Sequence, residues 1–531
     1  MTGALPAALR EWRAALGEEH VRTEAFDLLA ARGAPFAPRA RVPAILRPAS
    51  TADVQACVRI AQRHRIPLYP TSGGKNWGYG SRVPTEDGSV LVELGRMDRI
   101  VHVDEELALV DVEPGVTFRQ LDEFLRARGS RLFGSVTGGP PGGSLIGHAL
   151  ERGLGSGPYA HRADHVGSME VVLPTGGVVR TGYGRYGAEI ARVAPDGVGP
   201  SLAGLFTQSN LGIVTAMTFW LAPRPVHFQA ATFRVDDPDR LAGAVDAMHE
   251  LALQGVPRGG FHLWNVYKLL ATRGQYPWRE TAGATPLSLA LARDLASRQG
   301  IGAWNGSAAV YSASRGLGVE TRRLLGRSLG GRVDALAFHD PGAWAHRIRR
   351  FLGRRGPADD LARTPYFGVP TESLLPSSFW RKRYAPPADL DPDRSGCGLL
   401  WFNATVPFRG RDVSGAVACA ERTVLEGGFE PMVSLVLVEP RVAYLVGAIV
   451  YDRAVAGEDD RAHACHRRTL ASLGASGWLP YRLGVSSMDA LPDPTDDSAP
   501  LLADLKRVLD PHGVLAPGRY EPPRRGTAEV A

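Results

Sequence analysis

The chain has 531 residues and a formal net charge of +6, from 61 Lys and Arg against 55 Asp and Glu. With 44% hydrophobic and 22% charged residues, 62 Gly and 40 Pro, it is neither disordered throughout, nor collagen, nor a coiled coil. The basic residues are scattered instead of forming blocks, which argues against nucleic acid as a partner. Length alone predicts about three to four domain-sized units with a sizeable core.

Cysteine usage and the N-terminus bear on the compartment. Cys57, Cys397, Cys419 and Cys465 lie far apart without CxxC pairing, so neither a disulfide framework nor a zinc site is predicted. His463 and His466 flank Cys465, but only the two histidines share a face of the helix predicted there, and we expect no metal. The N-terminal residues carry charges throughout, and no stretch approaches about 18 uninterrupted apolar residues. We expect a cytoplasmic protein without a membrane partner.

The first half of the chain mixes predicted helices and strands. Ser50 is a plausible N-cap for an amphipathic helix over 50–63, and Thr117 with Gln120 forms a capping box for a second helix. A glycine-rich loop at 71–80 separates two predicted strands. Predicted strands cover 66–69, 89–92, two segments within 100–112, 169–173 and 178–181, the last two joined by a turn at 174–177.

The composition changes after Pro223–Pro225, where we place the start of a second domain. Longer helical patterns alternate there with apolar strand patterns, which predicts a sheet with helices on one face. Helices are predicted at 241–253, 287–296, 414–425 and 501–509, the last ended by Asp510 and Pro511, and strands at 398–402, 433–437 and 443–450.

Two glycine-rich stretches are the candidates for ligand binding. The run SGGKN, Ser72–Asn76, offers backbone N–H groups with few Cβ atoms in the way, so it can form an anion-binding nest to which Lys75 adds a charge. A tight turn with an ordinary surface lysine is the alternative. The run has neither Walker A nor Rossmann spacing. Because a second stretch, 138–157, doubles this capacity, an extended dinucleotide fits better than a single phosphate.

Several longer motifs carry a family resemblance. PTSGGKNWGYGSRVP from Pro70, ERGLGSGPYA from Glu151, GSMEVVLPTGGVVRTGYG from Gly167 and TQSNLGIVTAMTFWL from Thr207 resemble the flavin-binding domain of the vanillyl-alcohol oxidase and p-cresol methylhydroxylase family. LLWFNATVPFRGRD, VEPRVAYLVGAIVYDR, GWLPYRLG and VLDPHGVLAPGRYEP, from Leu399, Val438, Gly477 and Val508, resemble its C-terminal half in the same order. The resemblance covers residues from about 40 to 522.

The resemblance implies an α+β, two-domain flavoprotein. Its FAD-binding domain is discontinuous, and the substrate or cap domain inserted into it is built on an antiparallel sheet. For this chain we predict an FAD-binding domain over 1–225, with its core at about 40–225, a cap domain over 226–478, and a C-terminal return to the first domain over 479–531. A homodimer is left open.

The resemblance also implies site residues. The FAD is assigned to Ser72, Gly73, Gly74, Lys75 and Asn76, to Gly142, Gly143, Ser144, Gly147, Gly155 and Ile213, and to Arg519 near the flavin ring. A phenol is held as its phenolate by Tyr79, Tyr481 and Arg482, with Trp401 beside it. The alternatives are a turn aromatic for Tyr79, an exposed strand pair for Tyr481 and Arg482, a core aromatic for Trp401, and a solvated arginine for Arg519.

Departures from the family pattern are equally informative. The family's usual covalent flavin anchors, a histidine or a tyrosine, fall on Leu399 and Asp391, and Lys75 replaces the histidine of an SGGHN loop. We therefore expect non-covalent FAD, with an ester from Asp391 as the less favoured alternative. Gly139, Leu435 and Ala448 stand where acidic groups assist proton transfer, which predicts a more apolar pocket. His161 and His165 flank the second glycine-rich stretch and either touch a ligand or serve the structure.

The resemblance implies FAD-dependent oxidation of a para-substituted phenol at its benzylic carbon, through a p-quinone methide, with dioxygen as the electron acceptor. Three alternatives remain: a dehydrogenase that passes electrons to a cytochrome-like acceptor, a tailoring oxidase for a bulkier phenolic natural product, and a catalytically silent flavin-binding protein.

Overall fold

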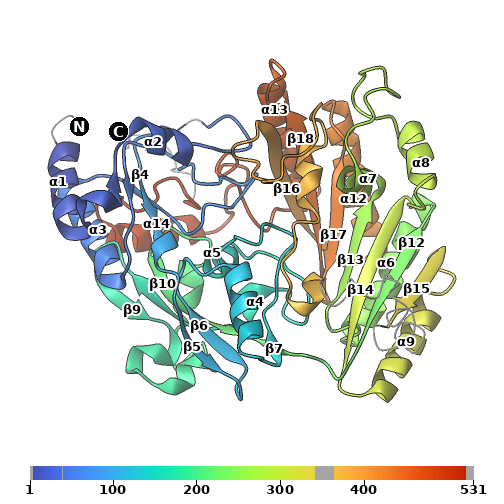
Figure 1. Cartoon of the computed structure of the whole chain (residues 1–531), viewed down its shortest axis with the longest axis horizontal. Coiled ribbons are helices and arrows are strands. Elements are labelled where there is room, and N and C mark those ends of the chain that lie inside the picture. The colour runs from blue at the N-terminus through green and yellow to red at the C-terminus, as the bar shows by residue number, and fades with distance from the viewer. Residues whose placement is uncertain (1–3, 39, 341–363, 522–531) are drawn as a thin grey trace.

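A computed structural model describes residues 4–38, 40–340 and 364–521, and Figure 1 shows its two side-by-side domains. The first domain contains a four-stranded and a five-stranded sheet, and the second contains a seven-stranded sheet. The α+β, two-domain prediction is therefore confirmed, and the three to four units suggested by length alone were too many. Residues 1–3 and 39 of the first predicted range, 341–363 of the second and 522–531 of the third lie outside the described residues.

The four-stranded sheet carries the first glycine-rich loop. Its order is β1 (Val21–Arg22), β2 (Ile45–Leu46), β4 (Val90–Glu93) and β3 (Leu68–Thr71), with β2, β4 and β3 parallel. Helices α1 (Ala4–Leu16) and α3 (Thr51–His64) pack together, and α2 (Ala25–Ala31) lies between β1 and β2 in sequence. As predicted, the Ser50 hydroxyl caps α3 by accepting from the Asp53 N–H. The loop after β3 therefore starts at the end of a buried parallel strand.

The five-stranded sheet is antiparallel, in the order β5 (Ile100–Asp104), β6 (Leu109–Val112), β10 (Ile213–Trp220), β8 (Val166–Val172) and β9 (Val178–Arg180). Helices α4 (Phe118–Ala127) and α5 (Leu145–Leu150) share a hydrophobic core with this sheet. A separate two-stranded sheet pairs β7 (Leu132–Phe133) with β11 (Ala222–Pro223). The predicted capping box of α4 is half formed. Thr117 accepts from the Gln120 N–H, but the Gln120 side chain donates to the Asp98 carbonyl at 2.7 Å instead of turning back.

The seven-stranded sheet of the second domain is antiparallel throughout. Its order is β15 (Ala335–His339), β12 (His227–Val235), β14 (Trp304–Ser312), β13 (Phe261–Asn265), β17 (Met432–Leu437), β18 (Val442–Asp452) and β16 (Cys397–Pro407). Strand β16 runs well past the predicted 398–402. Its polar residues Asn403 and Thr405 continue the strand because they bond to the Arg482 carbonyl, at 2.9 Å, and the Leu479 carbonyl, at 2.7 Å.

Side-chain alternation divides this sheet into two faces. Leu400, Phe402 and Ala404 of β16 lie in the core formed with α6 (Leu241–Leu253), α9 (Arg315–Leu329), α12 (Gly410–Glu426) and α13 (Glu458–Ala475). Leu399 and Trp401 point to the opposite face. That face is partly covered by α7 (Val266–Arg273) and α8 (Leu289–Ser297), so helices are not confined to one side as predicted. The remaining surface of that face is available to line a cavity.

The C-terminal segment returns to the first domain (Figure 1). After α14 (Ser498–Leu509), the chain exchanges backbone hydrogen bonds with β3, since Leu68 donates to Val514 and accepts from Ala516, both at 2.7 Å. Val514 and Leu515 are buried in the core of the four-stranded sheet. The predicted discontinuous domain is thus confirmed.

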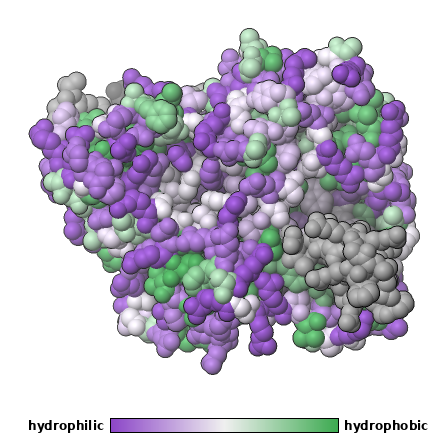
Figure 2. Space-filling model, in the orientation of Figure 1, coloured by the Kyte–Doolittle hydropathy of each residue, from purple (hydrophilic) through white to green (hydrophobic). Residues whose placement is uncertain are grey.

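On the face shown in Figure 2, hydrophilic residues dominate and hydrophobic ones form small separate groups. None of the helices in the described ranges combines the length and apolar character needed to cross a bilayer.

Asp510 holds the returning segment in place, which gives a stability prediction. Its buried carboxylate accepts from Gln62, Lys506 and the N–H groups of Val514 and Leu515, at 2.7 to 3.0 Å. Asp510→Ala leaves these donors without their acceptor, so we expect the free energy of unfolding to fall by about 3 kcal/mol. Chemical denaturation checks this, with Asp504→Ala, an exposed pair partner of Arg507 on the same helix, as the control. A loss no larger than the control's contradicts it.

Candidate active site

A cavity of about 610 Å³ lies between the two domains. The first domain contributes the loop after β3, the second glycine-rich stretch and part of β10. The second domain contributes the open face of its sheet, including His262, Trp264 and Trp401, together with Lys268 of α7. The C-terminal return adds Tyr481, Arg482 and Arg519. The segments of the residues predicted to hold FAD and the phenol therefore reach this one space, except the segment of Asp391.

The SGGKN loop offers backbone donors to the cavity. Within the described residues, the N–H groups of Gly73, Gly74, Lys75 and Asn76 make no hydrogen bond. Gly74 has a φ of +65°, and a Cβ there would collide with the Arg82 side chain. A Cβ on Gly73 would lie 3.3 Å from the Gly142 carbonyl, so the two glycine-rich stretches lie against one another. Free N–H groups on a cavity wall fit the pyrophosphate of a dinucleotide.

The other residues predicted to hold FAD divide into two groups. Gly142 and Asp391 do not reach the cavity, although the rest of the predicted set lines it. Those lining residues are Ser72, Gly73, Gly74, Lys75, Asn76, Gly143, Ser144, Gly147, Gly155, Ile213 and Arg519. The Gly142 carbonyl packs against Gly73 and leaves little room for a side chain there.

Tyr79, Tyr481 and Arg482 converge at one end of the cavity. The Arg482 guanidinium carbon lies 4.2 Å from the centre of the Tyr79 ring, and Tyr79 and Tyr481 lie close enough for each to influence the ionisation of the other. Trp401 stacks on Tyr79 with ring centres 6.4 Å apart and planes 14° apart. Arg482 is 9% exposed, so it does not belong to the exposed strand pair of the alternative interpretation, and Tyr79 is likewise buried, at 7%.

Asn403, which the sequence did not single out, organises this end. Its amide donates to the Arg482 carbonyl at 2.9 Å and to the Tyr79 hydroxyl at 3.4 Å, and its oxygen accepts from the Tyr481 N–H at 3.0 Å. An asparagine inside a strand-like apolar run was the available signal, because a buried amide must find partners.

A buried carboxylate balances two of the cavity's arginines. Glu151 binds Arg519, lies 3.6 Å from Arg482 Nε, and accepts from the Tyr520 hydroxyl at 2.8 Å. Burial alone would raise the pKa of Glu151, but Arg519 and Arg482 outweigh it and hold that pKa below its ordinary value. Within the described part of the chain, Arg482 Nε finds no hydrogen-bond acceptor, so this guanidinium keeps donor capacity for a ligand.

Burial keeps both site tyrosines protonated. It raises the pKa of Tyr79, against the opposing charge of Arg482, and raises that of Tyr481 well above its ordinary value, with Tyr79 adding to the effect. His148, which also lines the cavity, is held neutral because burial and then the charges of Arg162 and Arg482 lower its pKa. At neutral pH this end of the cavity presents neutral O–H groups and a guanidinium, which suits a ligand oxyanion.

Lys268 is a further cation on the cavity wall, and the sequence analysis missed it. It is 4% exposed, and burial lowers its pKa to about 8. Its signal was a lone lysine within the apolar run of residues 266–271, which by itself does not distinguish an inward lysine from an outward one.

The comparisons with known proteins agree with this geometry. Residues 42–182 match the FAD binding domain family. The chain is 46% identical to 1'-carboxy-chondrochloren decarboxylase of Chondromyces crocatus, over 98% of each chain. It is 30% identical to the 4-cresol dehydrogenase [hydroxylating] flavoprotein subunit of Pseudomonas putida, over 97% of this chain and 95% of that one.

The chain belongs to the p-cresol methylhydroxylase family of FAD-dependent oxidoreductases. Solved structures of p-cresol methylhydroxylase with substrate bound and of 4-ethylphenol oxidase from Gulosibacter chungangensis in an isoeugenol complex each superpose with a TM-score of 0.87. They are 26% and 25% identical to this chain, and each match covers 98% of it and 97% and 98% of the relative. FAD is thus the cofactor, and the free N–H groups after β3 are where this family member can hold its pyrophosphate.

Two positions inferred from the family pattern lie elsewhere than expected. Leu435 points into the helix-side core, whereas its neighbours Ser434 and Val436 line the cavity, because alternate residues of a strand face opposite ways. Ala448 lies opposite Trp401 on the cavity side of the sheet, but it is buried in the cluster under α7 and does not line the cavity. The polar groups of the cavity come from other positions, including Lys268, Ser377 and Ser378, so substitution at the inferred acidic positions does not make the pocket wholly apolar.

Asp391 does not reach the cavity but pairs with Lys75, which lines it. The Lys75 ammonium lies 2.9 Å from the Asp391 carboxylate, which Arg394 also approaches at 3.3 Å. Two cations lower the nucleophilicity of a carboxylate, and they give Asp391 a structural role.

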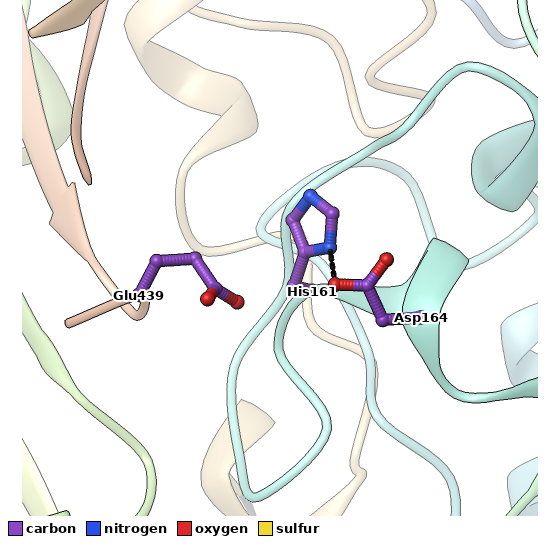
Figure 3. A group of neighbouring side chains, drawn as sticks. All are labelled: His161, Asp164 and Glu439. Atoms are coloured by element: carbon purple, nitrogen blue, oxygen red, sulfur yellow. Dashed lines mark hydrogen bonds and ion pairs between the residues drawn. The ribbon is translucent and has the colours of Figure 1, made fainter. Parts of the chain in front are cut away.

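The histidines singled out in the sequence do not line the cavity. His466 is buried, and its Nε2 lies 2.9 Å from the Trp401 carbonyl, while Cys465 belongs to the helix-side core. His161, Asp164 and Glu439 bring their ligand-type atoms within 4.8 Å of one another, and Figure 3 shows the His161–Asp164 hydrogen bond, at 2.7 Å, with Glu439 on the opposite side of the ring. Such groups are common without an ion, and we assign this one no role.

Non-covalent attachment of FAD remains a prediction that denaturation tests. Leu399 lines the cavity without a nucleophile, and Lys75 and Asp391 neutralise each other. We expect all of the yellow chromophore to pass an ultrafiltration membrane after acid or guanidinium denaturation. Colour that stays with the protein contradicts the prediction, and Asp391→Asn then decides whether the link is the Asp391 ester.

Proposed function

We propose that the protein oxidises a para-substituted phenol at its benzylic carbon through a p-quinone methide. The observation that carries this proposal is the convergence of the Tyr79 and Tyr481 hydroxyls with the partly unsatisfied Arg482 guanidinium. Two neutral donors and a permanent charge stabilise a phenolate, whose ordinary pKa is about 10. The match to a substrate-bound p-cresol methylhydroxylase structure supports the same use of the cavity.

The chain's residues prepare the substrate by binding it in its reactive ionisation state. Tyr79, Tyr481 and Arg482 would hold the phenolate. The phenolate pushes electron density through the ring to the para position, which makes the benzylic C–H group a better hydride donor. When bound, FAD accepts that hydride and so supplies the oxidation. Trp401, stacked against Tyr79, fixes the plane along which an aromatic substrate can lie.

The fate of the quinone methide defines a second, narrower proposal. It can add water, lose a proton to give an alkene, or lose CO₂ if the carbon next to the benzylic one carries a carboxylate. In the last case the C–C bond to the carboxylate breaks, its electron pair forms the new C=C bond, and the exocyclic pair returns to the ring as phenolate. The 46% identity to a protein named as a decarboxylase favours this fate, and with it a phenolic natural-product acid as substrate.

We also propose dioxygen as the electron acceptor, with a cytochrome-like acceptor as the alternative. Among the similar proteins are both an oxidase and a dehydrogenase. Stopped-flow mixing of the reduced protein with oxygen separates the two cases, since slow reoxidation contradicts the oxidase.

Anaerobic bleaching of the flavin absorbance tests the phenol proposal. We expect 4-alkylphenols to bleach it and their O-methyl ethers, which form no phenolate, to leave it unchanged. Tyr481→Phe and Arg482→Ala should each slow bleaching roughly 100-fold, because each removes a group that stabilises the oxyanion.

The matched control is Tyr444→Phe, which keeps the ring packed on Tyr481 and does not line the cavity. Bleaching by the ethers at the phenol rate, or an unchanged rate in both site variants, contradicts the proposal.

Product analysis tests the decarboxylation. From 3-(4-hydroxyphenyl)propanoate we expect 4-vinylphenol and one CO₂ for each flavin reduced, because the electron-poor quinone methide accepts the pair released with CO₂. Water addition would give the 3-hydroxy acid, and proton loss would give 4-hydroxycinnamate. Either of these as the main product contradicts the decarboxylation while leaving the phenol oxidation intact.

A further inference from the structure

Lys268 is a buried cation on the cavity wall without an anionic partner. It is 4% exposed, and its ammonium donates to the Ser377 hydroxyl at 3.0 Å. That ammonium also lies 5.3 Å from the centre of the Trp401 ring. No carboxylate among the described residues pairs with it. Burial is the sole cause of its lowered pKa, which agrees with the absence of a nearby charge in those residues.

The fold places this lysine rigidly. Asn265 ends β13 and caps α7 by accepting from the Lys268 N–H at 3.1 Å, and the Asn265 amide donates to Glu421 and to the Pro431 carbonyl. Its helix neighbours Val266, Tyr267, Leu270 and Ala271 are buried in the adjacent core. Lys268 thus leaves the first turn of an anchored helix toward the cavity.

Other cations on the segment that carries Ser377 are neutralised. Arg381 is buried with Glu430, 3.0 Å away, and Lys382 with Asp452. Arg162 is also buried without a carboxylate, but its guanidinium is hydrogen-bonded to the Ser135 carbonyl and to His148. It does not line the cavity. An uncompensated buried ammonium is costly, and an anion bound in the cavity that it faces would compensate it.

We propose that Lys268 binds a carboxylate carried by the para side chain of the phenol. The proposal rests on the proposed function, which places the phenolate at Tyr79, Tyr481 and Arg482. Trp401 links the two ends, because its ring stacks on Tyr79 and also lies beneath the Lys268 ammonium. The substrate class is a 4-hydroxyphenyl compound with an acid group on a short chain, its ring at the Tyr79 end and its acid at the Lys268 end.

Binding and reaction make opposite demands on this ion pair. Pairing with an ammonium stabilises the carboxylate and by itself opposes loss of CO₂. Lys268 therefore decides which side chains enter and orients them, and the quinone methide provides the electron demand for the later step. It is a specificity residue and not an acid or a base.

Binding of an unreactive ligand pair tests the proposal. In 4-hydroxyphenoxyacetate an oxygen replaces the benzylic carbon, so the compound cannot be oxidised there, and 2-(4-hydroxyphenoxy)acetamide is its neutral isostere. Isothermal titration of the FAD-loaded protein should show the acid binding roughly 30-fold more tightly than the amide. Lys268→Met, which keeps the length of the side chain, should remove this difference, and Lys268→Arg should restore part of it.

Each outcome separates this proposal from the proposed function. Equal affinities of the wild-type protein for acid and amide overturn the carboxylate site, whatever the variants do. A preference for the acid that survives in Lys268→Met also overturns it. In the control Tyr481→Phe, both affinities should fall by the same factor. If Tyr481→Phe changes neither while the acid preference disappears in Lys268→Met, the carboxylate site stands and the phenolate site fails.

The unfolding temperature of Lys268→Met is a further readout, and it needs no ligand. Lys268→Met should unfold at the same temperature as the wild type or a higher one, since it removes an unpaired buried charge. A selective loss of the oxygen reaction, with acid binding intact, would assign Lys268 to the oxygen step and overturn the carboxylate site.

Discussion

The buried guanidinium of Arg482 is the group on which the arrangement of the cavity depends. Two segments that lie far from it and from each other in the sequence meet on it: the glycine-rich loop at 71–80, through the Asn76 amide oxygen and the Tyr79 ring, and the second glycine-rich stretch, through Glu151. A permanent charge at 9% exposure requires such partners. Because these partners also form the walls for cofactor and substrate, satisfying one buried charge assembles both binding sites at once.

The second constraint is the two-residue period of the seven-stranded sheet. The residues of β16 that build the helix-side core, Leu400, Phe402 and Ala404, fix the orientation of Leu399, Trp401 and Asn403 by alternation. A shift of one residue in register would bury Trp401 among the helices and remove Asn403 from Arg482. Core packing therefore positions the site, and this explains why a long strand with a polar residue in its middle stays regular.

Much of this arrangement could be predicted from the sequence, and the rest depended on long-range contacts. The resemblance of whole motifs assigned Ser72–Asn76 to FAD and Tyr481 and Arg482 to the phenol, and both segments line the cavity. Alignment to a motif without the strand register placed Leu435 at the wall, whereas the register turns it into the core. Lys268, Glu151 and Asn403 were missed because each acquires its role from partners more than 70 residues away.

Two of the cations that line the cavity, Arg482 and Lys268, differ in their surroundings, and that difference carries chemical information. Arg482 has the Glu151 carboxylate 3.6 Å away, shared with Arg519, so its charge is partly balanced before a ligand arrives. Lys268 has a hydroxyl and an aromatic face for neighbours, both of which solvate a charge without cancelling it. The Lys268 end therefore offers a charge that no carboxylate of the described residues balances, while the tyrosine hydroxyls make the Arg482 end selective for a phenol oxygen. A ligand that satisfies both ends must carry a phenol and a second anionic group on opposite sides of one aromatic ring.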